Sequence, residues 1–123
     1  MKALIIEKTD DTPTIILDPE NKTFKIADRS LPEDANGFYS PVFIWLTEFL
    51  NNPTTDISFE FNLEYFNTSS AKQIAKVLLI LEKISTKVNV EILWKHKAED
   101  LDMKAAGERY SKLLNVKFSF ISL

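Results

Sequence analysis

Apolar and polar side chains alternate in a run near the middle of the chain, and this run is the clearest predicted strand. Ile57, Phe59, Phe61 and Leu63 are separated by single polar residues, which gives one apolar and one polar face. Shorter β-type runs, with Asp, Pro and Asn in the breaks between the first of them, predict further strands at residues 3–7, 14–17, 23–27, 88–95 and 116–120. The pattern therefore predicts about six strands.

Apolar residues at helical spacing predict three helices between the later strands. Ser40 followed by Pro41 is typical of an N-cap and a first helical residue, so the first helix is predicted to begin there. It is predicted to end before Asn51-Asn52-Pro53. The second and third helices are predicted at residues 69–86 and 99–114.

The order strand, helix, strand from Ile57 to Trp94 is a βαβ unit, which predicts parallel strands and a right-handed crossover. Both strands keep one polar face, so we expect the helices to cover mainly one side of the sheet. We therefore predict an α/β fold in which residues 1–123 form a single domain. Its mixed sheet has about six strands, and its three helices lie mainly on one face.

Composition argues against nucleic acid as the main partner. The chain of 123 residues has a net charge of −3, and lysines such as Lys72, Lys76, Lys83 and Lys87 alternate with apolar residues along a solvated helix face and do not form the basic stripe that a phosphate backbone requires. It contains no cysteine, which excludes disulfides, thiolate nucleophiles and cysteine-bound zinc. The N-terminus turns acidic too early for a signal peptide, and no apolar run approaches the ~20 residues of a membrane span. We expect a cytoplasmic protein without membrane insertion and without a cofactor.

Polar segments follow the predicted parallel strands. In α/β units, ligands and functional loops gather beyond the carboxyl ends of the strands. The segment from Tyr65 to Ser70 and the segment 96–102 are therefore expected to be neighbours. If the strand 23–27 runs in the same direction, Arg29, Ser30 and Glu33 join them.

Asn67-Thr68-Ser69-Ser70 opens the second predicted helix. Such residues most often only cap a helix, so in one interpretation Thr68 caps its own helix and the chain is a purely structural interaction module. The alternative is a phosphoacceptor, because the free N–H groups and the dipole of a helix N-terminus tolerate a phosphate. The residues alone leave both interpretations open.

Glu99, Asp100 and Asp102 form the main acidic cluster. It fits the acidic first turn of the third helix better than a metal site, because its spacing matches no calcium loop. A small metal-dependent hydrolase that uses this cluster is nevertheless a second hypothesis, and no metal ligand is assigned. His96 is interpreted as a solvated strand end and not as a base, because no nucleophile is paired with it.

The first helix has more apolar side chains than one stripe can bury. Tyr39 and Phe43 are therefore candidates for an exposed contact with a partner, since aromatic residues are enriched at interfaces. Glu99, Asp100 and Asp102 are further candidates, and if they lie near Thr68 they would repel a phosphate there.

Three sets of residues together resemble the SiaC family of bacterial regulatory phosphoproteins over essentially the whole chain. They are Arg29-Ser30-Leu31-Pro32-Glu33 with Phe38-Tyr39-Ser40-Pro41 and Trp45-Leu46; Glu64-Tyr65-Phe66-Asn67-Thr68-Ser69-Ser70-Ala71-Lys72; and Trp94 with Glu99-Asp100-Leu101-Asp102-Met103 and Gly107-Glu108. The sequence departs from the family at Ala27-Asp28, where a glycine is frequent, and at Lys95-His96-Lys97, where the family is aromatic and acidic.

The resemblance implies a STAS-like fold, similar to anti-sigma factor antagonists, and a protein that is not an enzyme. In the family a serine/threonine kinase phosphorylates the threonine of this motif, and a PP2C-type phosphatase removes the phosphate. The unphosphorylated form binds and activates a diguanylate cyclase, which raises cyclic di-GMP and promotes biofilm growth. Carried over to this chain, the acceptor is Thr68.

Overall fold

The computed structural model describes all 123 residues, which form six strands and three helices. The elements in chain order are β1 (Leu4–Ile6), β2 (Thr14–Asp18), β3 (Thr23–Ser30), α1 (Ala35–Asn51), β4 (Ile57–Phe66), α2 (Thr68–Ile84), β5 (Val90–His96), α3 (Leu101–Leu113) and β6 (Lys117–Ser122). The α/β class and the number of each kind of element agree with the prediction.

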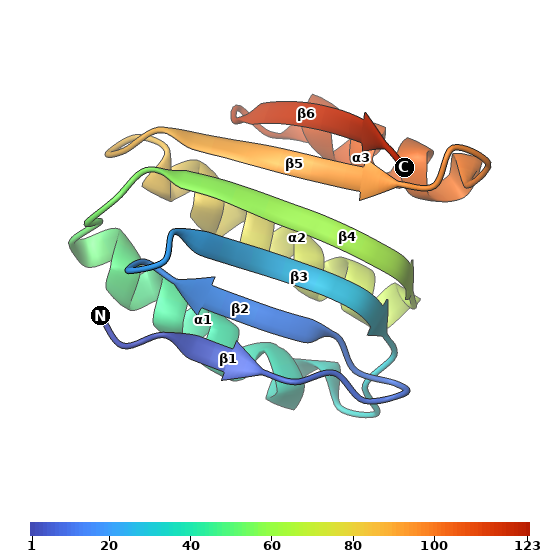
Figure 1. Ribbon diagram of the computed structural model, residues 1–123, viewed down its shortest axis with the longest axis horizontal. Coiled ribbons are helices and arrows are strands. Elements are labelled where there is room, and N and C mark those ends of the chain that lie inside the picture. The colour runs from blue at the N-terminus through green and yellow to red at the C-terminus, as the bar shows by residue number, and fades with distance from the viewer.

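The strands form one mixed sheet in the order β1-β2-β3-β4-β5-β6. β1, β2 and β3 are antiparallel neighbours, and β3, β4, β5 and β6 are parallel neighbours. Each parallel connection contains one helix, and Figure 1 shows all three helices behind the sheet with the termini at opposite edges. The predicted parallel pairing around α2 is confirmed, and the carboxyl ends of β3, β4 and β5 meet at one edge.

The core lies between the sheet and the helices, and it contains 23 buried apolar and aromatic residues. Phe59 and Phe61 of β4 point into it, and the Phe61 ring stacks on the Trp94 ring with 5.3 Å between centroids. Alternate residues of β4 are thus buried, as the sequence pattern predicts.

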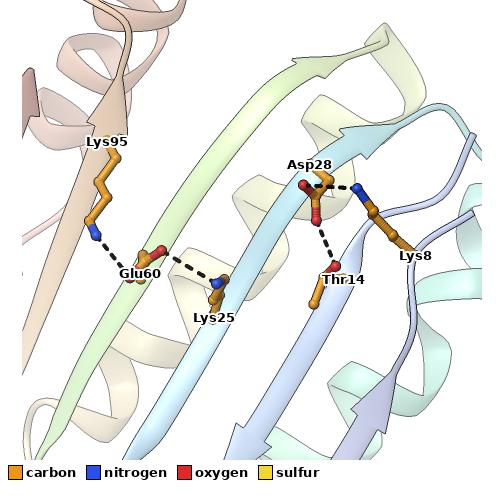
Figure 2. A network of polar contacts seen from close by, with 6 residues as sticks. All are labelled: Lys8, Thr14, Lys25, Asp28, Glu60 and Lys95. Carbon is orange, nitrogen blue, oxygen red and sulfur yellow. Dashed lines mark hydrogen bonds and ion pairs between the residues drawn. The ribbon is translucent and has the colours of Figure 1, made fainter. Parts of the chain in front are cut away.

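No helix covers the opposite face of the sheet, and its side chains on β3 and β4 are mostly polar. Glu60 of β4 lies between Lys25 of β3 and Lys95 of β5, with nitrogen–oxygen distances of 4.0 and 3.1 Å (Figure 2). On the next pair of strands, Lys117 and Glu91 are 3.4 Å apart. These cross-strand pairs allow a sheet to face water without an apolar cover.

α1 begins earlier than the sequence pattern predicts. Its N-cap is Asp34, whose Oδ1 accepts a 3.0 Å hydrogen bond from the Gly37 N–H. Pro41 lies inside the helix, so the prediction that Ser40 and Pro41 start it is wrong. Ser-Pro is a common helix start, but here a good cap six residues earlier adds a turn that buries Tyr39.

Asp28 has a positive φ of 78°, a conformation that favours glycine. A bulge follows directly, because β4 contributes an extra residue to the pairing between Asp28 and Arg29. The Asp28 carboxylate accepts a 2.6 Å hydrogen bond from the Thr14 hydroxyl and lies 3.8 Å from Lys8 Nζ (Figure 2). This geometry explains why a glycine suits this position, and why aspartate is tolerated there.

α3 packs on β5 through a glycine. A Cβ on Gly107 would overlap the Trp94 indole ring, so the helix and the ring are in direct contact. Trp94 Nε1 also donates a 3.0 Å hydrogen bond to the Met103 carbonyl. These two contacts fix the position of the acidic first turn of α3.

Candidate functional site

Thr68 is the first residue of α2 and is exposed. The N-cap is Asn67, whose Oδ1 accepts hydrogen bonds from the Ser70 N–H at 2.9 Å and from the Ser69 hydroxyl at 3.1 Å. The hydrogen bonds of this turn use Asn67, Ser69 and Ser70, and none uses the Thr68 hydroxyl. The expectation that Thr68 caps its own helix is therefore wrong, and its hydroxyl is available.

A buried chain of hydroxyl groups anchors this turn to the rest of the protein. Ser70 Oγ donates to the Ser30 carbonyl at 2.9 Å, and Ser30 Oγ donates to Ser70 Oγ at 2.8 Å. The Tyr39 hydroxyl lies 2.8 Å from Ser30 Oγ, and because the Ser30 proton is already used, Tyr39 is the donor. These hydrogen bonds thus join β3, α1 and α2 directly beside Thr68.

Tyr39 is fully buried, so the expectation of an exposed position is wrong. Burial raises the pKa of its phenol to about 12. Phe43 is half-buried on α1, and Lys76 Nζ lies 5.8 Å from its ring centroid. Of the two aromatic candidates, only Phe43 retains an accessible surface.

Arg29 and Tyr65 pair in register where β3 and β4 end, and both side chains are exposed. Glu33 is also exposed, and it lines a groove between the first turns of α1 and α2 together with Ser69 and Lys72. The predicted gathering of these residues with Ser30 at one edge is confirmed.

The acidic segment adjoins the end of β4 as expected. Asp100 and Asp102 line a shallow pocket of about 230 Å³ together with Tyr65 and Arg109. Asp100 is the N-cap of α3, since its Oδ1 accepts a 3.0 Å hydrogen bond from the Met103 N–H, and Asp102 lies in the first turn. The interpretation of this cluster as an acidic helix start is confirmed.

Metal chemistry finds no support in this arrangement. Glu99, Asp100 and Asp102 do not come together, and no group of three or more His, Cys, Asp or Glu side chains could hold a metal ion. The hypothesis of a metal-dependent hydrolase therefore has no site on which to rest.

His96 is buried, with only 6% of its surface exposed. Its Nδ1 lies 2.9 Å from the Lys97 carbonyl, and its own carbonyl accepts a hydrogen bond from the Leu123 N–H. The interpretation of His96 as a solvated strand end is wrong. The neighbouring lysines suggest an exposed position, but β6 and the C-terminal residue cover the histidine.

Tyr110 is a positioning residue that sequence reasoning missed. Its hydroxyl donates a 3.0 Å hydrogen bond to the Ala71 carbonyl, which ties α3 to the first turn of α2. Burial raises the pKa of this phenol, while the Arg109 charge acts in the opposite direction. Its helical spacing from the buried Met103 and Ala106 was the available signal.

No helix is both long and apolar enough to cross a membrane. No curated protein matches the sequence. Among solved structures, SiaC of Pseudomonas aeruginosa superposes with a TM-score of 0.88 at 23% identity, over 100% of both chains. The crystal structure of apo-SiaC from Pseudomonas aeruginosa gives a TM-score of 0.90 at 24% identity, over 99% of this chain and 100% of that one.

A third structure is that of the diguanylate cyclase SiaD in complex with its activator SiaC from Pseudomonas aeruginosa. The matched chain gives a TM-score of 0.88 at 23% identity, over 98% of this chain and 99% of that one. At these identities the structures establish the fold. The sequence model of the SiaC family regulatory phosphoproteins matches residues 6–123, nearly the whole chain. The chain therefore belongs to the SiaC family of regulatory phosphoproteins, which act as regulators and not as enzymes.

Proposed function

We propose that this chain is a phosphorylation-controlled activator of a diguanylate cyclase and that Thr68 is its phosphoacceptor. The observation that carries the proposal is the free Thr68 hydroxyl on an exposed helix start that Asn67 already caps. A kinase can therefore phosphorylate this hydroxyl without breaking a hydrogen bond that stabilises the fold.

The surroundings of Thr68 also accommodate the product. A phosphate brings about −1.5 to −2 charges at neutral pH, which the N–H groups and the dipole of a helix N-terminus stabilise. The first turn of α2 contains no acidic side chain, in contrast to that of α3 with Asp102. The phosphate would therefore change the surface beside Thr68 and leave the fold intact.

In this proposal the unphosphorylated form binds and activates the cyclase, and the phosphorylated form does not. A serine/threonine kinase adds the phosphate and a PP2C-type phosphatase removes it. The solved complex of a SiaC with a diguanylate cyclase supports the choice of partner, because its SiaC chain has the same fold over nearly its whole length. Arg29, Glu33 and Tyr65, exposed beside Thr68, are proposed to belong to the surface that the partners read.

The test uses the purified chain, the kinase and the cyclase from the same bacterium. Mass spectrometry after the kinase reaction should find one phosphate, on Thr68, and the phosphorylated protein should lose cyclase binding and stimulation of cyclic di-GMP synthesis. Thr68→Asp should behave like the phosphorylated form, and Thr68→Ala should bind but resist the kinase.

Ser69 provides the matched control, because its hydroxyl is also exposed in the first turn of α2. Ser69→Ala should remain a kinase substrate, and Ser69→Asp should retain most cyclase binding. Equal cyclase binding by Thr68→Asp and the parent chain would refute the proposal.

A further inference from the structure

The exposed side of α2 carries a row of basic side chains that begins at Thr68. Successive exposed positions along this side hold Thr68, Lys72, Lys76, Leu79 and Lys83, which we name the α2 crest. The spacing of three and four residues aligns them along one face of the helix. The crest contains no acidic residue, although the chain as a whole has a net charge of −3.

The lysines of the crest have no partner of opposite charge. The ion pairs of the protein involve Lys8, Lys25, Lys95 and Lys117, all of them outside α2. Glu82, the only acidic residue of α2, is engaged elsewhere, because its carboxylate accepts a hydrogen bond from the Asn115 N–H. The crest is therefore a positive strip without ion pairs, and Glu33 and Asp34, which line the groove beside Lys72 and Lys76, are the acidic residues at its head.

Apolar side chains accompany this charge. Leu79 is 49% exposed, and Ile44 of the neighbouring helix α1 is 60% exposed. Phe43 is half-buried on α1, and Lys76 lies against its ring. A partner could therefore bury apolar surface on the helix pair while it pairs with the lysines.

The groove at the head of the crest also contains an unsatisfied polar atom. Gln73 is only 5% exposed and lines this groove with Ser69, Lys72 and Lys76. Its Nε2 donates a 2.7 Å hydrogen bond to Asn36 Oδ1, but its Oε1 has no partner. Buried carbonyl oxygens are normally paired, so the packing of α1 against α2 leaves one polar group unsatisfied beneath the head of the crest.

We infer that the α2 crest is the docking surface for an acidic amphipathic segment of a protein partner. Carboxylates of the segment would pair with Lys72, Lys76 and Lys83, and its apolar side chains would cover Leu79 and Ile44. A protein fits better than nucleic acid or a membrane, because three lysines without an arginine on an acidic protein give weak binding to a polyanion.

The inference rests on the proposed function in one respect, which is the effect of Thr68. A phosphate there would be the first negative charge on the crest, four residues before Lys72. It would neutralise Lys72 and repel the acidic segment. Phosphorylation and partner binding would then compete for the same positive strip.

The test uses a synthetic helical peptide of glutamate and leucine in amphipathic order, and a second peptide with glutamine in place of glutamate. Amide shifts of the labelled chain should change along α2 and around Ile44 of α1 with the first peptide only, and the affinity should fall as salt rises. Lys72→Glu combined with Lys83→Glu should weaken binding by about tenfold or more, because attraction becomes repulsion at two positions.

α3 supplies the matched control, Lys104→Glu combined with Lys112→Glu. Each pair reverses the charge of two exposed lysines, and each includes a lysine in the last turn of a helix. The change in net charge and the effect on the helix dipole are therefore equal in the two pairs. The control should retain the parent affinity. Equal loss in both pairs, shifts confined to regions other than α2 and the part of α1 around Ile44, or preferential binding to vesicles that contain phosphatidylserine would each overturn the inference.

The same variants distinguish this inference from the proposed function. If the cyclase binds the parent chain, and phosphate on Thr68 prevents this, but the Lys72→Glu and Lys83→Glu pair binds normally, the crest inference fails and the switch stands. If the acidic peptide binds the crest but phosphate on Thr68 leaves cyclase binding unchanged, the switch fails and the docking surface stands.

Discussion

The Ser70 hydroxyl of α2 donates a 2.9 Å hydrogen bond to the carbonyl of Ser30, the last residue of β3. The two residues are 40 positions apart in the chain, and both are completely buried. A strand end is thereby joined to the helix turn that begins with Thr68. The turn is held from inside the protein, and its outer surface is left free for modification.

Ser70→Ala should lower the free energy of unfolding by about 1–3 kcal/mol, because it removes two buried hydrogen bonds and leaves the Ser30 hydroxyl proton without an acceptor. Urea denaturation measures this change. Ser69→Ala removes an exposed hydroxyl from the same turn and should cost less than about 0.5 kcal/mol. Equal costs for the two variants would show that the buried hydroxyl chain contributes nothing.

Asp28 offers a test of backbone conformation against side-chain bonding. Asp28→Ala loses the bond from Thr14 and keeps an unfavourable positive φ, so we expect it to be the least stable form. Asp28→Gly loses the same bond, but glycine adopts a positive φ without strain. Its free energy of unfolding should therefore exceed that of Asp28→Ala by about 1 kcal/mol. Thermal unfolding of the three proteins gives the order, and an alanine variant as stable as the glycine variant would exclude backbone strain at this position.

The two glycines of the chain should respond differently to alanine. Gly107→Ala places a methyl group in the Trp94 indole ring, so it should cost about 1–3 kcal/mol and separate α3 from β5. Gly37→Ala meets only the carboxylate of Asp34, which can turn aside at the expense of its cap hydrogen bond, and alanine is the better helix former. Trp94 fluorescence should therefore change in the first variant and not in the second. An unchanged spectrum and melting temperature for Gly107→Ala would contradict the close packing.

The alternation and the helical spacing of apolar residues were sufficient to predict the fold. Each strand and helix buries one face, and the apolar residues of that face recur in the sequence with the period of the element. The start of α1 was missed because Ser40-Pro41 and Asp34 are both good helix starts, and only the tertiary contacts of Tyr39 decide between them. Likewise, His96 is buried by β6 and the C-terminal residue, which no local pattern around it indicates.

The site was predictable to the extent that topology determines it. Ser30, Thr68 and Asp100 lie at or just beyond the carboxyl ends of the parallel strands β3, β4 and β5. The strand order therefore brings them to one edge of the sheet, independent of their side-chain contacts. The cap was assigned to the wrong residue, because Asn67, Thr68 and Ser69 are all capping types and only the backbone geometry selects Asn67. The pairing of Tyr110 with the Ala71 carbonyl depends on how α3 packs, which local spacing does not specify.

Stability should fall in alkaline solution because of Tyr39. Burial raises its pKa to about 12 from about 10 in the unfolded chain, so its contribution is complete below pH 10 and is lost as pH rises toward 12. Between about pH 9 and pH 11 this residue should account for a loss of about 1.4 kcal/mol. Tyr39→Phe should lose correspondingly less over that interval in urea denaturation, whereas Tyr65→Phe, at an exposed position, serves as the control. Parallel curves for the parent and Tyr39→Phe would show that the buried phenol is not responsible.

A negative charge at Thr68 should leave the fold intact and slightly more stable, which separates loss of binding from loss of structure. Thr68 begins α2, where a negative charge is favourable by about 0.3–1 kcal/mol, so Thr68→Asp should melt above Thr68→Lys. Thr86 lies two residues beyond the C-terminal end of α2, where a positive charge is favourable. At this position Thr86→Lys should therefore melt above Thr86→Asp. Both differences should shrink in high salt, because exposed charges are screened. If Thr68→Asp instead melted well below the parent, a failure of that variant to bind a partner would reflect unfolding and not the added charge.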